Sequence, residues 1–179
     1  MVIQGSGALY SPARRRTTLA AFRGKARFSL ESLLRALEVA GGDTFIVSIL
    51  LVTEDRQRLS CFVAPSLPRA YCDFIDDGPI GPNAGSCGTA AYCGHSIYVT
   101  DIATDPQWTD YREMALAHGL QACWSTPVFA ENHTVIGTFA VYHRRPRSPT
   151  ETEMEAIRLT SIALAPLLEL GLGAAAAGG

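Results

Sequence analysis

Two stretches near the ends of the chain have the spacing of amphipathic helices. Between Ser29 and Ala40, apolar residues recur every three or four positions, and two glycines follow as a stop signal. A longer helix is predicted from Pro149 to Leu170, because Ser148-Pro149-Thr150-Glu151 has the form of a capping box with proline at the first helical position. Each predicted helix has an apolar face that needs a partner surface.

Between these helices, the apolar residues follow the pattern of strands. Runs of β-branched and apolar residues predict strands at 44–53, 58–63, 97–102, 121–130 and 134–143. A short polar turn at 131–133 joins the last two runs and predicts a hairpin. Strands joined by short turns form antiparallel sheets, so the predicted fold class is α/β of the α+β kind, with the terminal helices packed on one face.

The middle of the chain, from about residue 64 to 119, has no simple period. It contains short helix signals at 65–76, 86–92 and 109–118, and a loop at 77–85 with three glycines and two prolines. Irregular segments of this length inside a compact domain are usually functional. We therefore expect a site in this part of the chain.

Charge divides the chain into three parts. Residues 1–27 hold six basic residues and no acidic one, and are expected to form a flexible basic arm. Residues 28–170 are the expected folded domain, and 171–179 are an alanine- and glycine-rich tail or linker. The whole chain is 47% hydrophobic with a net charge of −2, which is typical of a globular domain. We interpret the arm as a solvated linker, and expect neither a nucleic-acid nor a membrane partner.

Cysteine usage and the absence of a long apolar run indicate the compartment. The five cysteines are an odd number and form no C-x-x-C pair, so we expect neither a disulfide framework nor a metal site. Three consecutive arginines at 14–16 interrupt any secretory signal. The longest apolar run, Phe45–Val52, is far shorter than the roughly 20 residues that span a bilayer. We expect a cytoplasmic protein.

Small residues surround one thiol in the middle segment. The run Gly85-Ser86-Cys87-Gly88-Thr89-Ala90-Ala91 places Cys87 at the start of a predicted helix. A helix N-terminus binds anions and lowers the pKa of a thiol. The same small residues also suit close packing of a helix on a sheet, so both interpretations stay open.

Aromatic residues follow this run. Trp108 lies after a predicted turn, Tyr111, Arg112 and His118 fall in the next predicted helix, and Trp124 lies in a strand. Aromatic rings with a few polar groups are typical of small-molecule pockets. The tryptophans are also suited to an ordinary core, and for Trp124 the core interpretation is favoured.

Several motifs then occur together in the order found in the GAF domains of bacterial signalling proteins. They are Gly81-Pro82-Asn83-Ala84-Gly85-Ser86-Cys87-Gly88-Thr89-Ala90, Val99-Thr100-Asp101-Ile102, Asp105-Pro106-Gln107-Trp108, Ala117-His118-Gly119-Leu120 and Cys123-Trp124-Ser125-Thr126-Pro127. The chain resembles this family over about residues 28–170. The resemblance implies a central antiparallel sheet of about six strands with helices on both faces, a ligand pocket under the middle segment, and terminal helices that pair in a homodimer. Such domains occur beside PAS domains and ahead of histidine kinase, diguanylate cyclase or cyclic-di-GMP phosphodiesterase modules.

We therefore expect a sensory module that binds a small molecule, without catalysis of its own, and transmits the ligand state through its terminal helices. The candidate pocket residues are Cys87, Thr89, Asp101, Trp108, Arg112, His118, Trp124 and Tyr142. The identity of the ligand or cofactor is left unknown by the sequence, which lacks the motifs of cyclic-nucleotide or bilin binding, and His118 alone is weak support for heme.

Two alternatives remain. The chain also resembles the free methionine-R-sulfoxide reductases, which have a similar Gly-x-Cys-Gly run at 85–88 and for which Cys87 and Cys93 supply candidate thiols. It departs from them after Asp101, where Asp105-Pro106-Gln107-Trp108 stands in place of a further cysteine. The second alternative is a purely structural dimerisation module.

Overall fold

A single antiparallel sheet organises the chain. The computed structural model describes residues 12–42 and 45–176. The strands are β1 (Phe45–Val52), β2 (Arg58–Val63), β3 (Gly78–Pro79), β4 (Ile97–Val99), β5 (Ala122–Phe129) and β6 (Val135–His143). They lie in the order β3-β2-β1-β6-β5-β4. The expected α+β fold with a six-stranded antiparallel sheet is confirmed.

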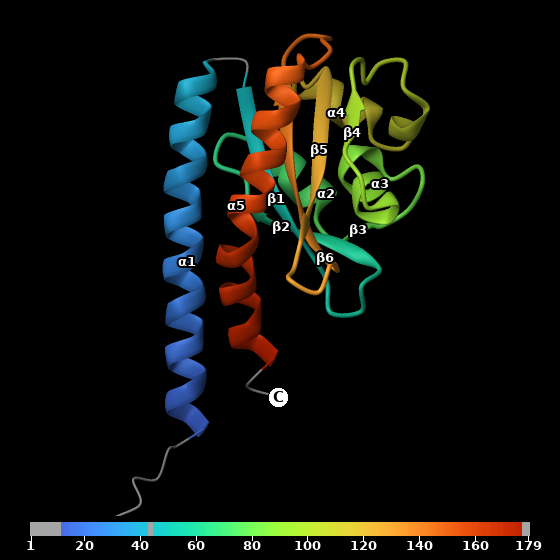
Figure 1. Ribbon diagram of the computed structural model, residues 1–179. Helices are drawn as coiled ribbons and strands as arrows, with labels where there is room; N and C mark the ends of the chain where they lie inside the picture. Colours follow the sequence, from blue (N-terminus) through green and yellow to red (C-terminus); the bar gives the residue numbers. More distant parts are fainter. Residues whose placement is uncertain (1–11, 43–44, 177–179) are drawn as a thin grey trace, which may run out of the picture.

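Two long helices cover one face of the sheet (Figure 1). They are α1 (Pro12–Gly41) and α5 (Glu151–Ala176), which lie side by side although they come from opposite ends of the chain. The core beneath them includes Leu34 of α1, Leu164 of α5 and Trp124 of β5. This face has the partner surface that the amphipathic pattern requires.

Short helices cover the other face. They are α2 (Arg69–Ile75), α3 (Gly85–Cys93), the single 3₁₀ turn η1 (Pro106–Trp108) and α4 (Arg112–Ala117). A second apolar core lies between them and the sheet. The sheet therefore separates two cores, and alternate residues of β5 and β6 point into each.

The pairing of β1 and β5 with β6 between them places small residues side by side across the sheet. Ser48 pairs with Ala140, which in turn pairs with Ser125 on the far side. Gly137 of β6 is required where the strands approach most closely, since a Cβ built on it would lie 2.5 Å from the Leu50 carbonyl oxygen.

The helices extend further than the sequence pattern predicts. Helix α1 begins at Pro12, so residues 12–27, expected to be a flexible arm, are helical and run beyond the sheet (Figure 1). Alanine, leucine, arginine and lysine dominate that stretch, and their helix propensity explains the extension. Helix α5 likewise continues to Ala176, into the expected tail. The arm's first residues, 1–11, and the last three of the tail lie outside the described residues.

The start of α5 differs in register from the prediction. The capping box is formed by Thr150 and Glu153, two residues later than the predicted Ser148 and Glu151. The Glu153 backbone N–H donates to Thr150 Oγ1 at 3.2 Å, and Thr150 N–H donates to Glu153 Oε2 at 2.8 Å. Thr150 therefore caps a helix that starts at Glu151. No helix in the described part of the chain combines the length and apolar character needed to cross a membrane.

Candidate functional site: a cavity between α3 and the sheet

A small cavity lies where the start of α3 faces the sheet. Its volume of about 30 Å³ is enough for one or two water molecules. The lining comes from strands β1, β2, β3 and β6, from α2 and α3, and from the segment around η1. The lining residues are Leu50, Leu59, Tyr71, Ile75, Gly78, Pro79, Ala84, Gly85, Ser86, Cys87, Gly88, Trp108, Tyr111 and Tyr142. None of these side chains is charged.

Glycines allow α3 to lie close to the cavity wall. Gly85 has a φ of +62°, a left-handed conformation that favours glycine at the start of the helix. A Cβ built on Gly88 would lie 2.5 Å from the Pro79 carbonyl oxygen of β3 and 2.5 Å from the Cβ of Ala84. The small residues of this run therefore serve close packing, one of the two interpretations that the sequence left open.

Ser86 joins α3 to the sheet and to the tryptophan that closes the cavity. Its hydroxyl donates to the Cys123 carbonyl oxygen of β5 at 3.0 Å. The Ser86 hydroxyl oxygen in turn accepts the indole N–H of Trp108 at 3.1 Å. Because both bonds are buried, the Trp108 ring is held against α3 in one orientation.

The segment that carries Trp108 is held by backbone contacts. Asp105 caps η1, since its carboxylate accepts the Gln107 backbone N–H at 2.9 Å. Arg112 donates to the carbonyl oxygens of Asp105 at 2.9 Å and Ile102 at 3.2 Å. Arg112 therefore fixes the shape of the η1 loop from outside the cavity.

Aromatic rings form much of the wall. Tyr71 of α2 meets Tyr142 of β6 edge to face, with ring centroids 6.0 Å apart. Trp108 meets Tyr111 in the same manner at 6.4 Å. Burial raises the pKa of both Tyr71 and Tyr142 well above the usual value, so these phenols are neutral and offer O–H groups to the interior.

One of the lining residues, the thiol of Cys87, lies beside a second thiol. Cys87 of α3 lies within hydrogen-bonding reach of Cys123 of β5, and this contact, with the hydroxyls of Ser125, Thr138 and Tyr142, lowers the pKa of Cys87 to about 7. Burial, and then the neighbouring Cys87, raise the pKa of Cys123 well above its usual value. Cys123 therefore keeps its proton at a pH at which Cys87 loses its own.

The sheet beneath α3 carries buried hydroxyls. Ser48, Ser125 and Thr138 are completely buried around the small side chain of Ala140. Within the described part of the chain, none of the three hydroxyls makes a hydrogen bond of ordinary geometry. Such groups are costly to bury without partners, and the two nearest Cys87, Ser125 and Thr138, lie where they can donate to its sulfur.

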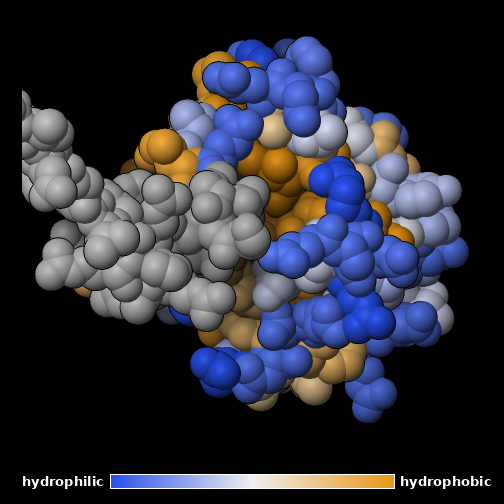
Figure 2. Space-filling view, turned by 90° about the horizontal axis from the view of Figure 1, so that it is seen from below, coloured by the Kyte–Doolittle hydropathy of each residue, from blue (hydrophilic) through white to orange (hydrophobic). Residues whose placement is uncertain are grey.

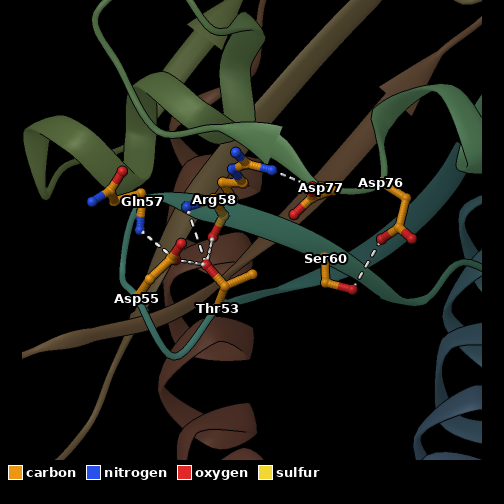
Figure 3. A network of polar contacts seen from close by, with 7 residues as sticks. All are labelled: Thr53, Asp55, Gln57, Arg58, Ser60, Asp76 and Asp77. Atoms are coloured by element: carbon orange, nitrogen blue, oxygen red, sulfur yellow. Dashed lines mark hydrogen bonds and ion pairs between the residues drawn. The ribbon is translucent and has the colours of Figure 1, made fainter.

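A surface network supports the wall formed by β3 (Figure 3). The Asp76 carboxylate accepts from Ser60 Oγ at 2.9 Å and from the Cys61 backbone N–H at 2.8 Å, and Arg58 pairs with Asp77. These contacts fasten the end of α2 to β2. Figure 2 looks onto this end of the molecule and shows hydrophobic residues in a hollow between hydrophilic ones.

The structure brings three of the eight sequence candidates to the cavity, namely Cys87, Trp108 and Tyr142. Thr89 donates to the Pro82 carbonyl oxygen at 3.3 Å, and the Asp101 carboxylate accepts from the Ala103 N–H at 2.9 Å, so both hold loops.

The other candidates lie elsewhere. Arg112 holds the η1 loop, and His118 ends α4 with its ring 6.1 Å from Tyr71. Trp124 points to the opposite face of the sheet, into the core under α1 and α5, because it alternates with Cys123 along β5. Of the two candidates on the β5–β6 hairpin, Tyr142 therefore lines the cavity and Trp124 does not.

Several residues in or beside the cavity could not be identified from the sequence. Tyr71 lies in a short helix whose partner face depends on the fold, and Ser86 is one of many small residues in its run. Cys123 could have been found from the alternation of β5, which places it on the face opposite Trp124. Among the described residues, no group of three or more histidine, cysteine or acidic side chains is placed to hold a metal ion.

Comparison with known proteins identifies the family. The family model for the GAF domain matches residues 27–169. The chain belongs to the GAF domain family. A curated relative, the methyl sulfide methyltransferase-associated sensor of Methanosarcina acetivorans, is 36% identical over 113 residues. That match covers 63% of this chain and 11% of the relative, so this GAF domain spans only a small part of the sensor's length.

Solved GAF structures share the fold at low sequence identity. A GAF domain region from Geobacter sulfurreducens superposes with a TM-score of 0.71 at 16% identity, covering 86% of this chain and 99% of the other. The type II free methionine-R-sulfoxide reductase of Thermoplasma acidophilum superposes with a TM-score of 0.66 at 13% identity, covering 83% of this chain and 95% of the other. The expectation that this chain is not an enzyme is therefore corrected, because its fold is also that of enzymes.

Proposed function

We propose that this GAF domain is a sensory module that binds a small uncharged molecule in the cavity under α3. The observation that carries the proposal is the cavity itself, a largely apolar and aromatic pocket whose wall includes the Trp108 indole held by Ser86. The relative of 36% identity is named a sensor, and the match to only 11% of its length is consistent with one module in a larger protein.

The lining predicts the class of ligand. A lining with several aromatic rings and no acidic or basic residue favours a planar, neutral molecule. The volume of about 30 Å³ is much smaller than the roughly 300–1,000 Å³ of typical ligand sites. Binding of a drug-sized molecule therefore requires the wall of α3 and η1 to move outward, and the two buried bonds of Ser86 are the contacts that such movement breaks.

The path to the terminal helices begins at Glu38. This largely buried carboxylate of α1 accepts the Val47 N–H of β1 at 3.0 Å and the Ser66 hydroxyl at 2.6 Å. Ser66 lies shortly before α2, which contributes Tyr71 to the cavity wall. We propose that a shift of α2 reaches α1 through this carboxylate, as a change in the populations of two arrangements.

The outer surfaces of α1 and α5 suit pairing with a second copy. Large apolar residues are exposed along both helices: Phe28, Leu33 and Val39 on α1, and Leu159, Ile162, Leu167 and Leu170 on α5. We propose a homodimer through these helices, as the family resemblance implies. Sedimentation of the full chain, with the Leu159→Glu and Ile162→Glu variant as comparison, tests it: a dimer that persists in the variant contradicts the proposal.

Hydrogen exchange with a neutral aromatic probe tests the ligand site. We expect the fluorine NMR signal of 5-fluoroindole to broaden when the compound is mixed with the protein. We also expect the compound to change hydrogen exchange in residues 77–119. The Ser86→Ala variant removes the closing bonds and is expected to alter both measurements. Thr109→Ala is the matched control, since its hydroxyl bonds only to the exposed Pro106 carbonyl oxygen at 2.8 Å. Absence of binding, with an intact dimer, would favour a purely structural module.

A second candidate function is thiol-dependent reduction of methionine sulfoxide. It is favoured by the fold shared with the Thermoplasma enzyme and by Cys87, whose thiol lines the cavity with a lowered pKa. Turnover of free methionine-R-sulfoxide that disappears in Cys87→Ser would support it. Exposed Cys93, the other thiol considered from the sequence, lies six residues further along α3, about 9 Å away by the helical rise.

A further inference from the structure

The cavity and a pair of neighbouring thiols lie at one place in the structure. Cys87 is 9% exposed and lines the cavity, whereas Cys123 of β5 is completely buried and is not part of the lining. The Ser86 hydroxyl bond to the Cys123 carbonyl oxygen fixes the start of α3 over that strand residue. A molecule in the cavity therefore meets Cys87 first, and Cys123 only through Cys87.

We propose that Cys87 and Cys123 form a hydroperoxide-reactive thiol pair, in which a peroxide admitted to the cavity oxidises Cys87 and Cys123 then closes a disulfide between α3 and β5. The cavity of about 30 Å³ accepts a molecule the size of hydrogen peroxide without the outward movement that a larger ligand requires. The inference uses the cavity of the proposed sensory site but needs no other ligand.

The reaction balances in two steps. The Cys87 thiolate attacks one peroxide oxygen, the O–O bond breaks, and the departing hydroxide takes up a proton to leave as water, so that Cys87 becomes a sulfenic acid. The Cys123 sulfur then attacks the Cys87 sulfur, the S–O bond breaks, and a second water leaves with the Cys123 proton. Two thiols lose two electrons in total, and one peroxide gains them.

The surroundings favour this order of reaction. The groups facing Cys87 are Cys123 from β5, Tyr142 from β6, Tyr71 from α2 and Tyr111 beside η1, and the tyrosines are neutral near pH 7 because burial raises their pKa. The hydroxyls of Ser125 and Thr138 also lie within reach of the Cys87 sulfur and stabilise its thiolate. Cys87 is thus the nucleophile and Cys123, which keeps its proton, is the resolving thiol.

The remaining cysteines provide the internal comparison. Cys61 of β2 and Cys72 of α2 also lie within hydrogen-bonding reach of each other, but neither lines the cavity. Cys93 is exposed at the end of α3. A reaction governed by exposure alone would therefore modify Cys93 first, whereas one governed by the cavity would modify Cys87.

Peptide mapping of the whole protein after brief treatment with hydrogen peroxide decides between these outcomes. We expect a mass lower by two hydrogen atoms and a cross-linked peptide joining Cys87 to Cys123. In Cys123→Ser, we expect the disulfide to be absent and a sulfenic acid to be trapped on Cys87 by dimedone. The matched control Cys93→Ser should keep the Cys87–Cys123 link.

Oxidation confined to Cys93, or a link between Cys61 and Cys72 alone, would overturn the proposal, and the map of the unaltered protein gives this answer even if a variant fails to fold. Failure of the sensory proposal is seen separately, as absence of fluoroindole binding in the reduced protein. A protein that binds the probe but forms no Cys87–Cys123 link refutes only the thiol pair.

Discussion

Replacement of Gly88 by alanine tests the packing that shapes the cavity. The added methyl group would lie 2.5 Å from both the Pro79 carbonyl oxygen and the Cβ of Ala84, distances that force the helix or β3 to move. Overpacking of this kind costs about 1–3 kcal/mol. Alanine recovers roughly 0.5–1 kcal/mol of helix propensity relative to glycine. The expected net change is a loss of up to about 2.5 kcal/mol in the free energy of unfolding.

Urea unfolding followed by far-ultraviolet circular dichroism measures this change. Gly24→Ala is the matched control, because Gly24 also lies within a helix but nothing lies within 4 Å of the methyl group it would gain. We expect Gly24→Ala to leave stability unchanged or raise it. If Gly88→Ala raised stability as much as Gly24→Ala does, the close approach of α3 to β3 would be wrong.

Three further predictions follow from contacts already described. Ser86→Ala leaves the buried Trp108 indole N–H without its acceptor, so unfolding free energy should fall by about 1–3 kcal/mol, measured by the same urea titration. Thr150→Ala removes the capping hydroxyl of α5 and should cost about 1 kcal/mol, while exposed Thr152→Ala should cost almost nothing. The pKa of Cys87, lowered to about 7, makes its thiolate form at lower pH than that of an ordinary cysteine, so alkylation of Cys87 by iodoacetamide should rise with pH to a midpoint near 7. A midpoint near 9 would contradict that assignment.

The strands and the general fold could be predicted from sequence because their signals are local. The runs that became β1, β2, β5 and β6 were found within a residue or two of their bounds, since β-branched residues and polar turns mark both ends. The two-residue β3 was missed inside an expected loop, because its pairing with β2 depends on contacts distant in the chain. Helix α1 was predicted too short because its first half has good helix formers but no clear apolar period.

The site was harder to predict because it depends on which way each side chain points. Trp124 and Cys123 are neighbours in sequence, yet they enter different cores. From sequence alone, an aromatic residue is assigned to a pocket more readily than a cysteine is. Which of the two residues points to the cavity side of the sheet could be decided only from the strand register. Arg112 looked like a ligand residue because an isolated arginine near a pocket is conspicuous, but its partners are backbone carbonyl oxygens.

The pleat of β6 gives the domain two surfaces that can be altered separately. Ala140 and Tyr142 face the core on the cavity side of the sheet, whereas Phe139 and Val141 face the core beneath the long helices. Substitutions on the first face can therefore change what the pocket accepts while the contacts of α1 and α5 stay the same. The three buried hydroxyls around Ala140 lie on the first face, so their replacement would alter the cavity side of the sheet without touching the residues packed under α1 and α5.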